Sequence, residues 1–308
     1  MRVIVTGANG FIGRAFVEAL LAANKHEVVA LDTVAPSSTG LNGASWVCAD
    51  ICDPDVISSL FHEPCDALVH LATLPGGAAE KNQELARKVN IDATLNLLEA
   101  IRSPDHVPKV IFSSSIAVYG EFAGKVVDDH TPPAPRMIYG AQKLMAENWI
   151  AALTRRGEIT GLSLRIPGVV ARPQAPSGMK SAFMSNIFHA ASSAGTFESP
   201  VSAAATMWLT SRKCVVENLM HALTLDTDQL PPSLAVTLPG LRVTMQDLAR
   251  ATAQHADCPQ DFIRYAPDAG LEAAFGNLPD HRFRCAARMG FCDDGDLDRL
   301  VTSAFSTL

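Results

Sequence analysis

The chain opens with a strand pattern that runs into a helical pattern through three glycines, and this junction constrains the fold more than any other feature. Arg2–Thr6 is a short β-branched run, and Phe11–Ala23 carries apolar residues at helical spacing. Gly7 would permit a sharp turn between them, and Gly13 would let the helix pack closely on the strand. The segment therefore predicts a strand, a tight turn and a helix.

The same alternation continues along the first half of the chain. Further strand patterns lie at 27–31, 45–49, 66–71, 109–114 and 162–166, and helical patterns lie at 54–61, 83–102 and 138–155. The strands are apolar runs rather than alternating ones, as burial on both faces of a parallel sheet requires. Beyond Pro167, prolines punctuate shorter apolar pieces. We therefore predict an α/β fold of the Rossmann type: a doubly wound parallel sheet over 1–170, with a return segment near 205–240, and a smaller mixed C-terminal lobe over 171–308.

Composition narrows the classes of protein to which the chain can belong. Its 308 residues and 48% hydrophobic content suffice for a sizeable core, and a formal charge of -7 without a block of like charges argues against nucleic-acid binding. No apolar run reaches the roughly 18 residues of a membrane span, and no leader pattern precedes the first strand, so we expect a cytoplasmic protein. The seven cysteines contain no Cys-x-x-Cys, so we expect free thiols and no metal site.

The glycine turn has the spacing of a dinucleotide site. Backbone N–H groups and the positive end of the helix would face a pyrophosphate. A carboxylate about 20 residues on, at the end of the second strand, accepts hydrogen bonds from a ribose diol and repels a 2'-phosphate, and Asp32 occupies this place. No arginine or lysine occurs at 33–39, so we expect NAD rather than NADP. The residues expected to bind it here are Gly7, Asn9, Gly10, Phe11, Ile12 and Asp32.

Asp50 ends the third strand pattern and has two interpretations. It could meet the adenine amino group, with Ile51 beside it, or it could be a plain cap of the helix that follows. The sequence leaves both open.

A tyrosine and a lysine stand four residues apart on the predicted helix 138–155, so Tyr139 and Lys143 share one face. An ammonium about 5 Å from a phenol, at an effective dielectric of about 20, stabilises the phenolate by roughly 3 kcal/mol, or about two pKa units. Ser115 follows the strand 109–114 at the carboxyl edge, where ligands bind in open α/β sheets, and could hold a reacting oxygen. The alternative is an amphipathic helix beside a polar loop.

Taken together, these motifs resemble the extended short-chain dehydrogenase/reductase family, also called NAD-dependent epimerase/dehydratases. The resemblance covers about residues 1–170. It rests on the glycine turn, Asp32, Asp50, the stretch 70–72, Asn90, the stretch 113–120 and the pair Tyr139 and Lys143. One departure is Gln142, where a serine is common; we expect it to face away from the pair.

The resemblance implies a role for each of these residues. Tyr139 would be the general base, Lys143 would hold the nicotinamide ribose and lower the tyrosine pKa, and Ser115 would orient the substrate oxygen. Asn90 would support the site from behind. The remaining residues expected to bind the cofactor are Leu71, Ala72, Thr73, Asn90, Ser113, Tyr139, Lys143 and Pro167.

The second half of the chain points to one branch of the family. The Asn-x-x-Gly-Pro segment usual in sugar-nucleotide members is missing from the stretch 164–173. The stretches 70–80, 165–173, 183–187, 200–201, 208–211 and 238–241 instead resemble the D-erythronate dehydrogenase branch. That branch oxidises the 2-hydroxyl of a small sugar acid with NAD. Arg172 is the candidate for the substrate carboxylate, because a guanidinium can bind it through two hydrogen bonds; it could equally tie the two lobes together. Pro75-Gly76-Gly77 departs from the branch and leaves the substrate open.

Two other functions stay possible at this point. One is a sugar-nucleotide epimerase or dehydratase that keeps its NAD bound, and the other is a non-catalytic NAD-sensing regulator. In the resembled family the helices near 83–102 and 138–155 commonly form a dimer interface, so we expect a homodimer.

Overall fold

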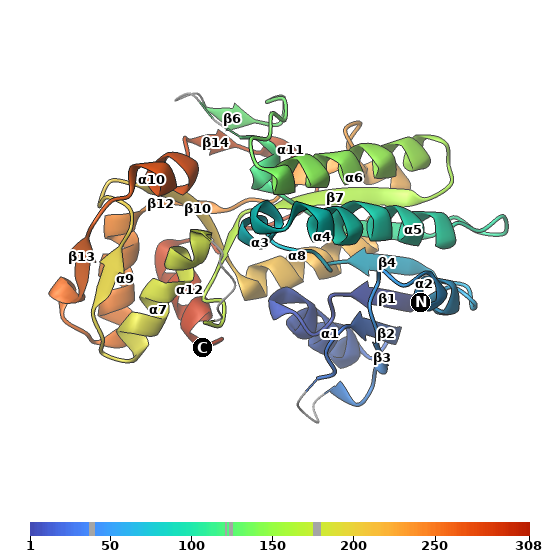
Figure 1. Cartoon of the computed structure of the whole chain (residues 1–308), viewed down its shortest axis with the longest axis horizontal. Coiled ribbons are helices and arrows are strands. Elements are labelled where there is room, and N and C mark those ends of the chain that lie inside the picture. The colour runs from blue at the N-terminus through green and yellow to red at the C-terminus, as the bar shows by residue number, and fades with distance from the viewer. Residues whose placement is uncertain (37–40, 121, 123–125, 175–179) are drawn as a thin grey trace. The chain divides into compact units, whose positions relative to one another are not determined.

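The computed structural model of the chain describes residues 1–36, 41–120, 122, 126–174 and 180–308. It divides into two compact units (Figure 1). The first comprises Met1–Gly120, Pro133–Arg165 and Val216–Val236. The second comprises Glu121–Pro132, Ile166–Val215 and Thr237–Leu308.

A seven-stranded sheet forms the centre of the first unit. Its strands are β1 (Arg2–Thr6), β2 (Glu27–Asp32), β3 (Ser45–Cys48), β4 (Ala67–His70), β5 (Lys109–Ser115), β7 (Thr160–Ile166) and β11 (Ala235–Thr237), in the order β11-β7-β5-β4-β1-β2-β3. The pairs from β3 through β5 run parallel, with Val3 opposite Val28 on one side and Ala67 on the other. The reversal of strand order beside β1 is that of a doubly wound Rossmann sheet, so the predicted fold class is confirmed.

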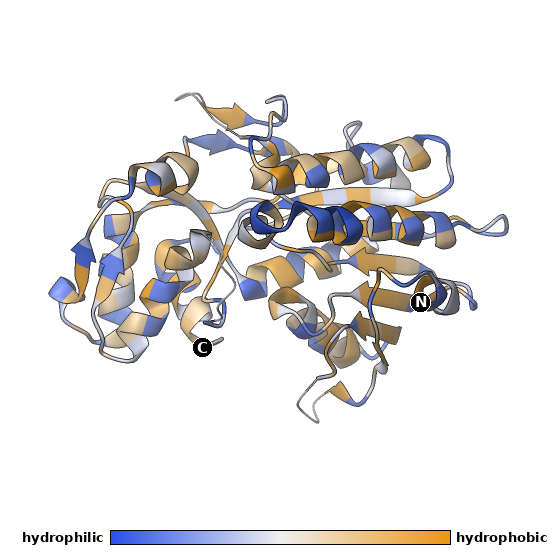
Figure 2. Cartoon of the chain, viewed as in Figure 1, coloured by the Kyte–Doolittle hydropathy of each residue, from blue (hydrophilic) through white to orange (hydrophobic). Residues whose placement is uncertain are grey.

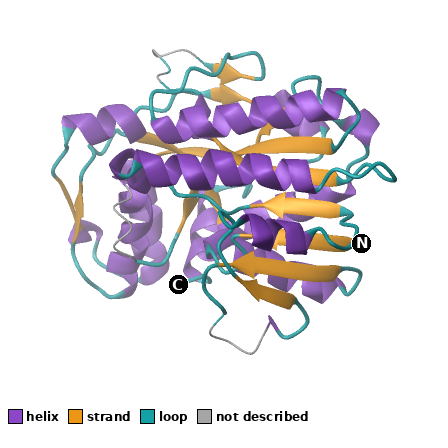
Figure 3. Ribbon diagram, turned by 45° about the vertical axis from the view of Figure 1, so that its right-hand side comes forward, coloured by secondary structure: helices purple, strands orange, loops and turns teal. Residues whose placement is uncertain are grey.

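Helices cover both faces of this sheet. They are α1 (Phe11–Ala23), α2 (Pro54–Leu60), α3 (Gly76–Lys81), α4 (Gln83–Arg87), α5 (Ala93–Ala100), α6 (Ile138–Arg155) and α8 (Arg212–Thr224), the last beginning in the second unit. Side chains of α2, α5 and α6 pack on one face around Ile4, Leu68 and Phe112. Figure 3 shows α5 and α6 side by side across that face. Figure 2 shows that β1, β2 and β4 are mostly hydrophobic, as strands buried on both faces of a sheet are.

The helical pattern predicted over 83–102 is interrupted in the structure. Between α4 and α5 the chain forms one π-helical turn, η2 (Lys88–Asp92). A π turn inserts one extra residue into the helix and rotates the side chains beyond it, and such turns occur often at functional sites. The residue at its centre is Asn90.

The second unit is a less regular α/β assembly. Its strands are β6 (Val127–Asp128), β8 (Gly168–Val170), β9 (Phe197–Ser199), β10 (Thr206–Ser211), β12 (Leu241–Thr244), β13 (Ile263–Tyr265) and β14 (His281–Arg282). Its helices are α7 (Phe183–Ser192), α9 (Met245–Ala256), α10 (Ala269–Phe275), α11 (Arg284–Arg288) and α12 (Leu297–Phe305). A mixed sheet, β12-β10-β8, packs with α7, α9 and α12 around a separate apolar core. No helix of the described residues has the length and apolar character needed to cross a membrane.

Candidate active site

The glycine turn between β1 and α1 is built as the sequence indicates. Gly7 has φ +67°, and a Cβ there would lie 2.7 Å from the backbone nitrogen of Ala72. At Gly13 a Cβ would lie 2.0 Å from the carbonyl oxygen of Gly7, so only glycine lets α1 approach the turn. The first turn of α1 carries no acidic residue, and its N-cap, Gly10, has no side chain to bind it. Its N–H groups therefore present the positive helix end to an anion, as a pyrophosphate requires.

Asp32 ties this turn to the end of β2. Its Oδ2 accepts a hydrogen bond from the backbone N–H of Asn9 at 2.9 Å, and its Oδ1 accepts one from Val34 at 3.3 Å. The carboxylate is half-buried, and a carboxylate has about four lone-pair sites. It can therefore hold the turn and still accept hydrogen bonds from a ribose diol.

Asp50 does not cap the next helix, so that interpretation is wrong. The N-cap of α2 is Asp53, whose side chain accepts a hydrogen bond from Asp55 N–H. Asp50 lies exposed past β3, where its Oδ1 accepts from the N–H of Cys52 at 2.9 Å, and Ile51 is buried beside it. A role for either residue toward adenine stays a prediction.

Asn90 uses its whole side-chain amide to hold the segment that follows β4. Its Oδ1 accepts hydrogen bonds from Leu74 N–H at 2.8 Å and from the Thr73 hydroxyl at 3.0 Å. Its Nδ2 donates to Leu74 O at 3.1 Å and to Gln142 Oε1 at 2.8 Å. Only 4% of Asn90 is exposed. The side chain thus fixes the stretch that was expected to line the cofactor.

Gln142 does not turn away from the site, contrary to the expectation. It is three residues after Tyr139 on α6 and therefore its neighbour along the helix surface. A backbone N–H can only donate, so Leu74 fixes the orientation of the Asn90 amide, and Gln142 must offer its oxygen. Gln142 therefore connects α6 to the Thr73–Leu74 segment through Asn90, a contact that spans 52 residues of chain.

Lys143 is buried, with 2% exposed, and its Nζ donates to Ser113 O at 2.7 Å. The same Nζ lies 5.6 Å from the ring centre of Tyr139 and 4.6 Å from that of Phe112. Burial lowers the pKa of Lys143 to about 7, and the Glu147 carboxylate opposes that shift. A site of this kind favours an added negative charge near the ammonium, such as a phenolate.

The ring of Tyr139, at the start of α6, lies against the start of α3. A Cβ on Gly76 would come within 3.7 Å of the tyrosine Cδ1. At the same end of α6, a Cβ on Gly140 would lie 2.2 Å from the carbonyl oxygen of Ala117, so the helix can pack directly on the short helix η3 (Ile116–Val118). Ser115 caps η3: its Oγ accepts from Ala117 N–H at 3.1 Å. Its hydroxyl hydrogen remains able to donate to another oxygen.

A buried ion pair that was not predicted from the sequence lies one turn further along α6. Glu147 receives three hydrogen bonds from the Arg165 guanidinium, the shortest 2.8 Å, and one from Ser114. Burial opposes the charge of Arg165, but the bonds to Glu147 outweigh it and raise the pKa of the guanidinium. Arg165 also donates to Tyr119 Oη at 3.1 Å. The i, i+4, i+8 spacing of Tyr139, Lys143 and Glu147 indicates that Glu147 shares their helix face, but it does not point to Arg165 on another element.

Two predicted residues belong to the second unit. Pro167 packs within that unit against Gly240, where a Cβ would lie 2.9 Å from the proline Cγ. Arg172 follows β8; its Nε donates to Val169 O at 3.1 Å, and its carbonyl accepts from His189 Nε2 at 2.7 Å. The first contact orients the guanidinium, and the second holds the backbone of Arg172. Roles of Pro167 toward the cofactor and of Arg172 toward the substrate stay predictions.

Among the residues that the structure describes, no three histidine, cysteine or acidic side chains gather in a way that could hold a metal ion. All seven cysteines are free thiols.

Comparison with known proteins agrees with this geometry. The sequence model of the NAD dependent epimerase/dehydratase family matches residues 3–208. A D-erythronate dehydrogenase of Cupriavidus necator is 31% identical over 313 residues, which cover 98% of this chain and 97% of that protein. A second, from Haemophilus influenzae, is 30% identical over 308 residues, with 98% of both chains covered.

Solved structures share the whole fold. A nucleoside-diphosphate-sugar epimerase from Agrobacterium tumefaciens superposes with a TM-score of 0.89 at 25% identity, covering 98% of this chain and 92% of the other. An L-threonine dehydrogenase from Cupriavidus necator superposes with a TM-score of 0.87 at 20% identity, and both chains are covered completely.

The chain belongs to the NAD dependent epimerase/dehydratase family, the extended type of short-chain dehydrogenase/reductase. It is an NAD-dependent dehydrogenase. The turn at Gly7, the open first turn of α1 and the carboxylate of Asp32 fit the cofactor of this family.

Proposed function

We propose that the enzyme oxidises the 2-hydroxyl of a small sugar acid, such as D-erythronate, with NAD. The observation that carries the proposal is the buried Lys143 beside the Tyr139 ring, on the same unit as the glycine turn. The two relatives named D-erythronate dehydrogenase, which match over nearly the full chain, support the substrate class.

Each proposed catalytic group has a defined task. Tyr139 accepts the proton of the substrate hydroxyl at its phenolate oxygen. Ser115 donates a hydrogen bond to the same substrate oxygen as it becomes a carbonyl. Lys143, held by Ser113 O, would supply the positive charge that favours the phenolate and would bind the nicotinamide ribose. The chemistry that bound NAD would supply is acceptance of the hydride, with its two electrons, from the adjacent carbon. The products are the 2-oxo acid, NADH and one proton.

The proposed cofactor site comprises the glycine turn and the residues near it at the carboxyl edge of the sheet. Gly7, Asn9, Gly10, Phe11 and Ile12 would hold the pyrophosphate, and Asp32 the adenosine ribose. Asp50, Ile51, Leu71, Ala72, Thr73, Asn90, Ser113 and Pro167 complete the proposed set. In the second unit, Arg172 would bind the substrate carboxylate, because its planar fork is held in one orientation by Val169 O.

The decisive experiment measures NADH formation with four-carbon sugar acids and, in parallel, with nucleotide sugars. The proposal expects absorbance to rise with a sugar acid. Tyr139→Phe should lower the rate by about a thousandfold, within the usual contribution of a general base, while the dissociation constant for NAD changes less than about twofold.

The main rival is a nucleotide-sugar epimerase, the function named for the structural neighbour from Agrobacterium tumefaciens. That enzyme would be purified with tightly held cofactor, would interconvert nucleotide sugars and would give no net NADH. A second rival is an NAD-sensing regulator without catalysis. It would bind NAD but turn over no member of either panel.

We also propose a homodimer that uses α4 and α6. These helices pack together and expose apolar side chains, with Leu85 41%, Met145 57% and Trp149 44% accessible. Light scattering should give twice the chain mass of 32.8 kDa, and Trp149→Glu should shift the particle to the monomer mass. A cytoplasmic location stays a prediction.

A further inference from the structure

Three buried polar side chains of the first unit form a chain that no part of the proposed reaction uses. The hydroxyl of Thr6, at the end of β1, lies 2.6 Å from Nδ1 of His70, at the end of β4. Nε2 of His70 lies 2.9 Å from the hydroxyl of Thr94 on α5. At most 2% of each residue is exposed, so water does not compete for these bonds.

The donor and acceptor of each hydrogen bond among Thr6, His70 and Thr94 can be assigned, starting from the Asn90 carbonyl at one end. Thr94 Oγ1 lies 2.9 Å from the carbonyl oxygen of Asn90, and because a carbonyl only accepts, Thr94 donates its hydrogen there. Thr94 must therefore accept from His70, whose hydrogen is on Nε2. The free lone pair of His70 is then on Nδ1, and Thr6 donates to it.

The imidazole has to be neutral for this order to hold. A second ring hydrogen on Nδ1 would face a hydroxyl that already donates in that direction. Burial, and secondarily the charge of Lys143, lower the pKa of His70 to about 3. The ring is also held in its plane by stacking on Phe112, with 5.7 Å between ring centres and 28° between planes.

Both ends of the chain return to the segment after β4. Thr6 Oγ1 accepts from Ala72 N–H at 3.4 Å, and the Thr6 carbonyl accepts from Leu71 N–H at 3.1 Å. At the other end Asn90 binds Leu74 through both its N–H and its carbonyl. The hydrogen bonds thus close a ring around residues 70–74, and this segment presses on Gly7 at Ala72.

We propose that Thr6, His70 and Thr94 are positioning residues for NAD, which act as one unit to hold the segment Leu71–Leu74 against the glycine turn. The segment Leu71–Leu74 and the glycine turn are both expected to bind the cofactor. The closed ring of hydrogen bonds sets the distance between them. The inference rests on the proposed cofactor site, but it assumes nothing about the substrate. None of the three side chains needs to touch NAD.

The test uses Thr6→Val and Thr94→Val, which keep the side-chain shape and remove one hydroxyl each. These residues do not bind each other, so independent roles predict additive losses of NAD affinity. If the chain works as a unit, each single variant should weaken NAD binding by about tenfold, and the double variant by no more than about twentyfold. Isothermal titration of purified protein with NAD measures this without any substrate.

Two controls accompany the pair. Ser163 on β7 is equally buried, and its Oγ has no hydrogen-bond partner among the described residues, so Ser163→Ala should leave the affinity within about twofold. Thr6→Ser and Thr94→Ser keep the hydroxyls and should restore most of the affinity.

Two results would overturn the inference. One is an additive loss of about a hundredfold in the double variant. The other is unchanged NAD affinity with a lowered unfolding temperature, as a purely structural role predicts. Wild-type protein that bound no NAD would instead refute the cofactor site itself.

A second measurement does not depend on whether the valine variants fold. Ring nitrogen chemical shifts of His70 in the wild-type protein should show a neutral imidazole with its hydrogen on Nε2. A hydrogen on Nδ1 would contradict the order of the chain.

Discussion

The two edges of the central sheet both carry polar groups, but they use them differently. At the amino edge, charged side chains bind backbone carbonyls: Arg2 reaches Leu60 O and Glu63 O, and Lys109 reaches Leu223 O and Leu225 O. At the carboxyl edge, neutral side chains bind other side chains and the segment after β4: His70 binds Thr94, and Asn90 binds both Gln142 and Leu74.

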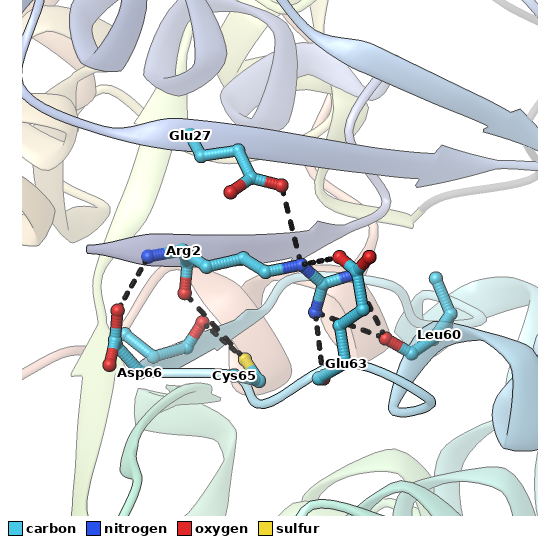
Figure 4. A network of polar contacts seen from close by, with 7 residues as sticks. Arg2, Glu27, Leu60, Glu63, Cys65 and Asp66 are labelled. Carbon is cyan, nitrogen blue, oxygen red and sulfur yellow. Dashed lines mark hydrogen bonds and ion pairs between the residues drawn. The ribbon is translucent and has the colours of Figure 1, made fainter.

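Burial separates the two edges. Figure 4 shows Arg2 between Glu27 and Glu63, at 3.4 and 3.5 Å from its Nε, and the side chains of these acids are 61% and 69% exposed. At the carboxyl edge, His70, Asn90, Gln142 and Lys143 are each less than 9% exposed. Hydrogen bonds without water competition hold groups to one geometry. The sheet therefore places its exposed structural contacts at one edge and its preorganised groups at the other, where the proposed site lies.

The largest expected loss of stability follows from breaking the Glu147–Arg165 ion pair behind the proposed site. Glu147→Ala leaves the Arg165 charge buried without its partner, so it should lower the free energy of unfolding by about 3–5 kcal/mol. Urea denaturation of the two proteins measures this. A loss below about 1 kcal/mol would mean that this pair behaves like the exposed ones at the other edge.

Acid should weaken the carboxyl edge first. The pKa of His70 is about 3 in the folded protein, against an ordinary 6.5 in the unfolded chain. Between these values the unfolded chain binds a proton that the folded protein does not. The stability is therefore fully present above about pH 6.5 and falls by about 1.4 kcal/mol per pH unit as the pH drops toward 3. Urea denaturation at several pH values between 6.5 and 5 measures the free energy of unfolding. This free energy should decrease less with falling pH in His70→Gln than in the wild type, and an equal decrease would contradict a buried neutral imidazole.

Gln142 should matter for turnover more than for stability. Gln142→Ala removes the acceptor of Asn90 Nδ2 and should lower the NADH production rate by about tenfold. Gln142→Glu keeps an acceptor oxygen and should stay within about twofold of that rate. Steady-state assays of both variants and the wild type with the same sugar acid test this. A rate of Gln142→Ala equal to that of the wild type would show that Asn90 needs no support from α6.

The smallest effect belongs to the amino edge. Glu27→Gln and Glu63→Gln each remove one exposed partner of Arg2, whose guanidinium still binds two carbonyls. Each should change the free energy of unfolding by less than about 1 kcal/mol, and the change should vanish in high salt. A loss comparable to that of Glu147→Ala would remove the contrast between the edges.

Much of the first unit could be predicted from local pattern. The strand, turn and helix around Gly7 need glycine at fixed positions, because a Cβ would collide with backbone there. The helix 138–155 was predicted with its observed ends, since an 18-residue apolar periodicity leaves little choice of period. Helical spacing also placed Lys143 beside Tyr139.

Other features could not be predicted because they join residues far apart in the chain. The π turn at Asn90 interrupts a sequence pattern that predicts one continuous helix. Its role can be seen only in the folded protein, where Asn90 binds both Leu74 and Gln142. Gln142 was expected to face away from Tyr139 and Lys143. Helical periodicity gives the direction of a side chain around its own helix, but it does not show which other elements, here Asn90, lie in that direction. Glu147 and Arg165 lie on different elements, and neither predicts the other.

Local sequence alone determined the order of most strands and helices of the first unit, the glycine turn with Asp32 and the spacing of Tyr139 and Lys143, because backbone sterics and helical periodicity act over a few residues. Tertiary structure decided which polar groups are withdrawn from water and which partners they then require. The partners of His70 and Asn90 come from β1, α5 and α6, and only the folded sheet brings those elements to one edge.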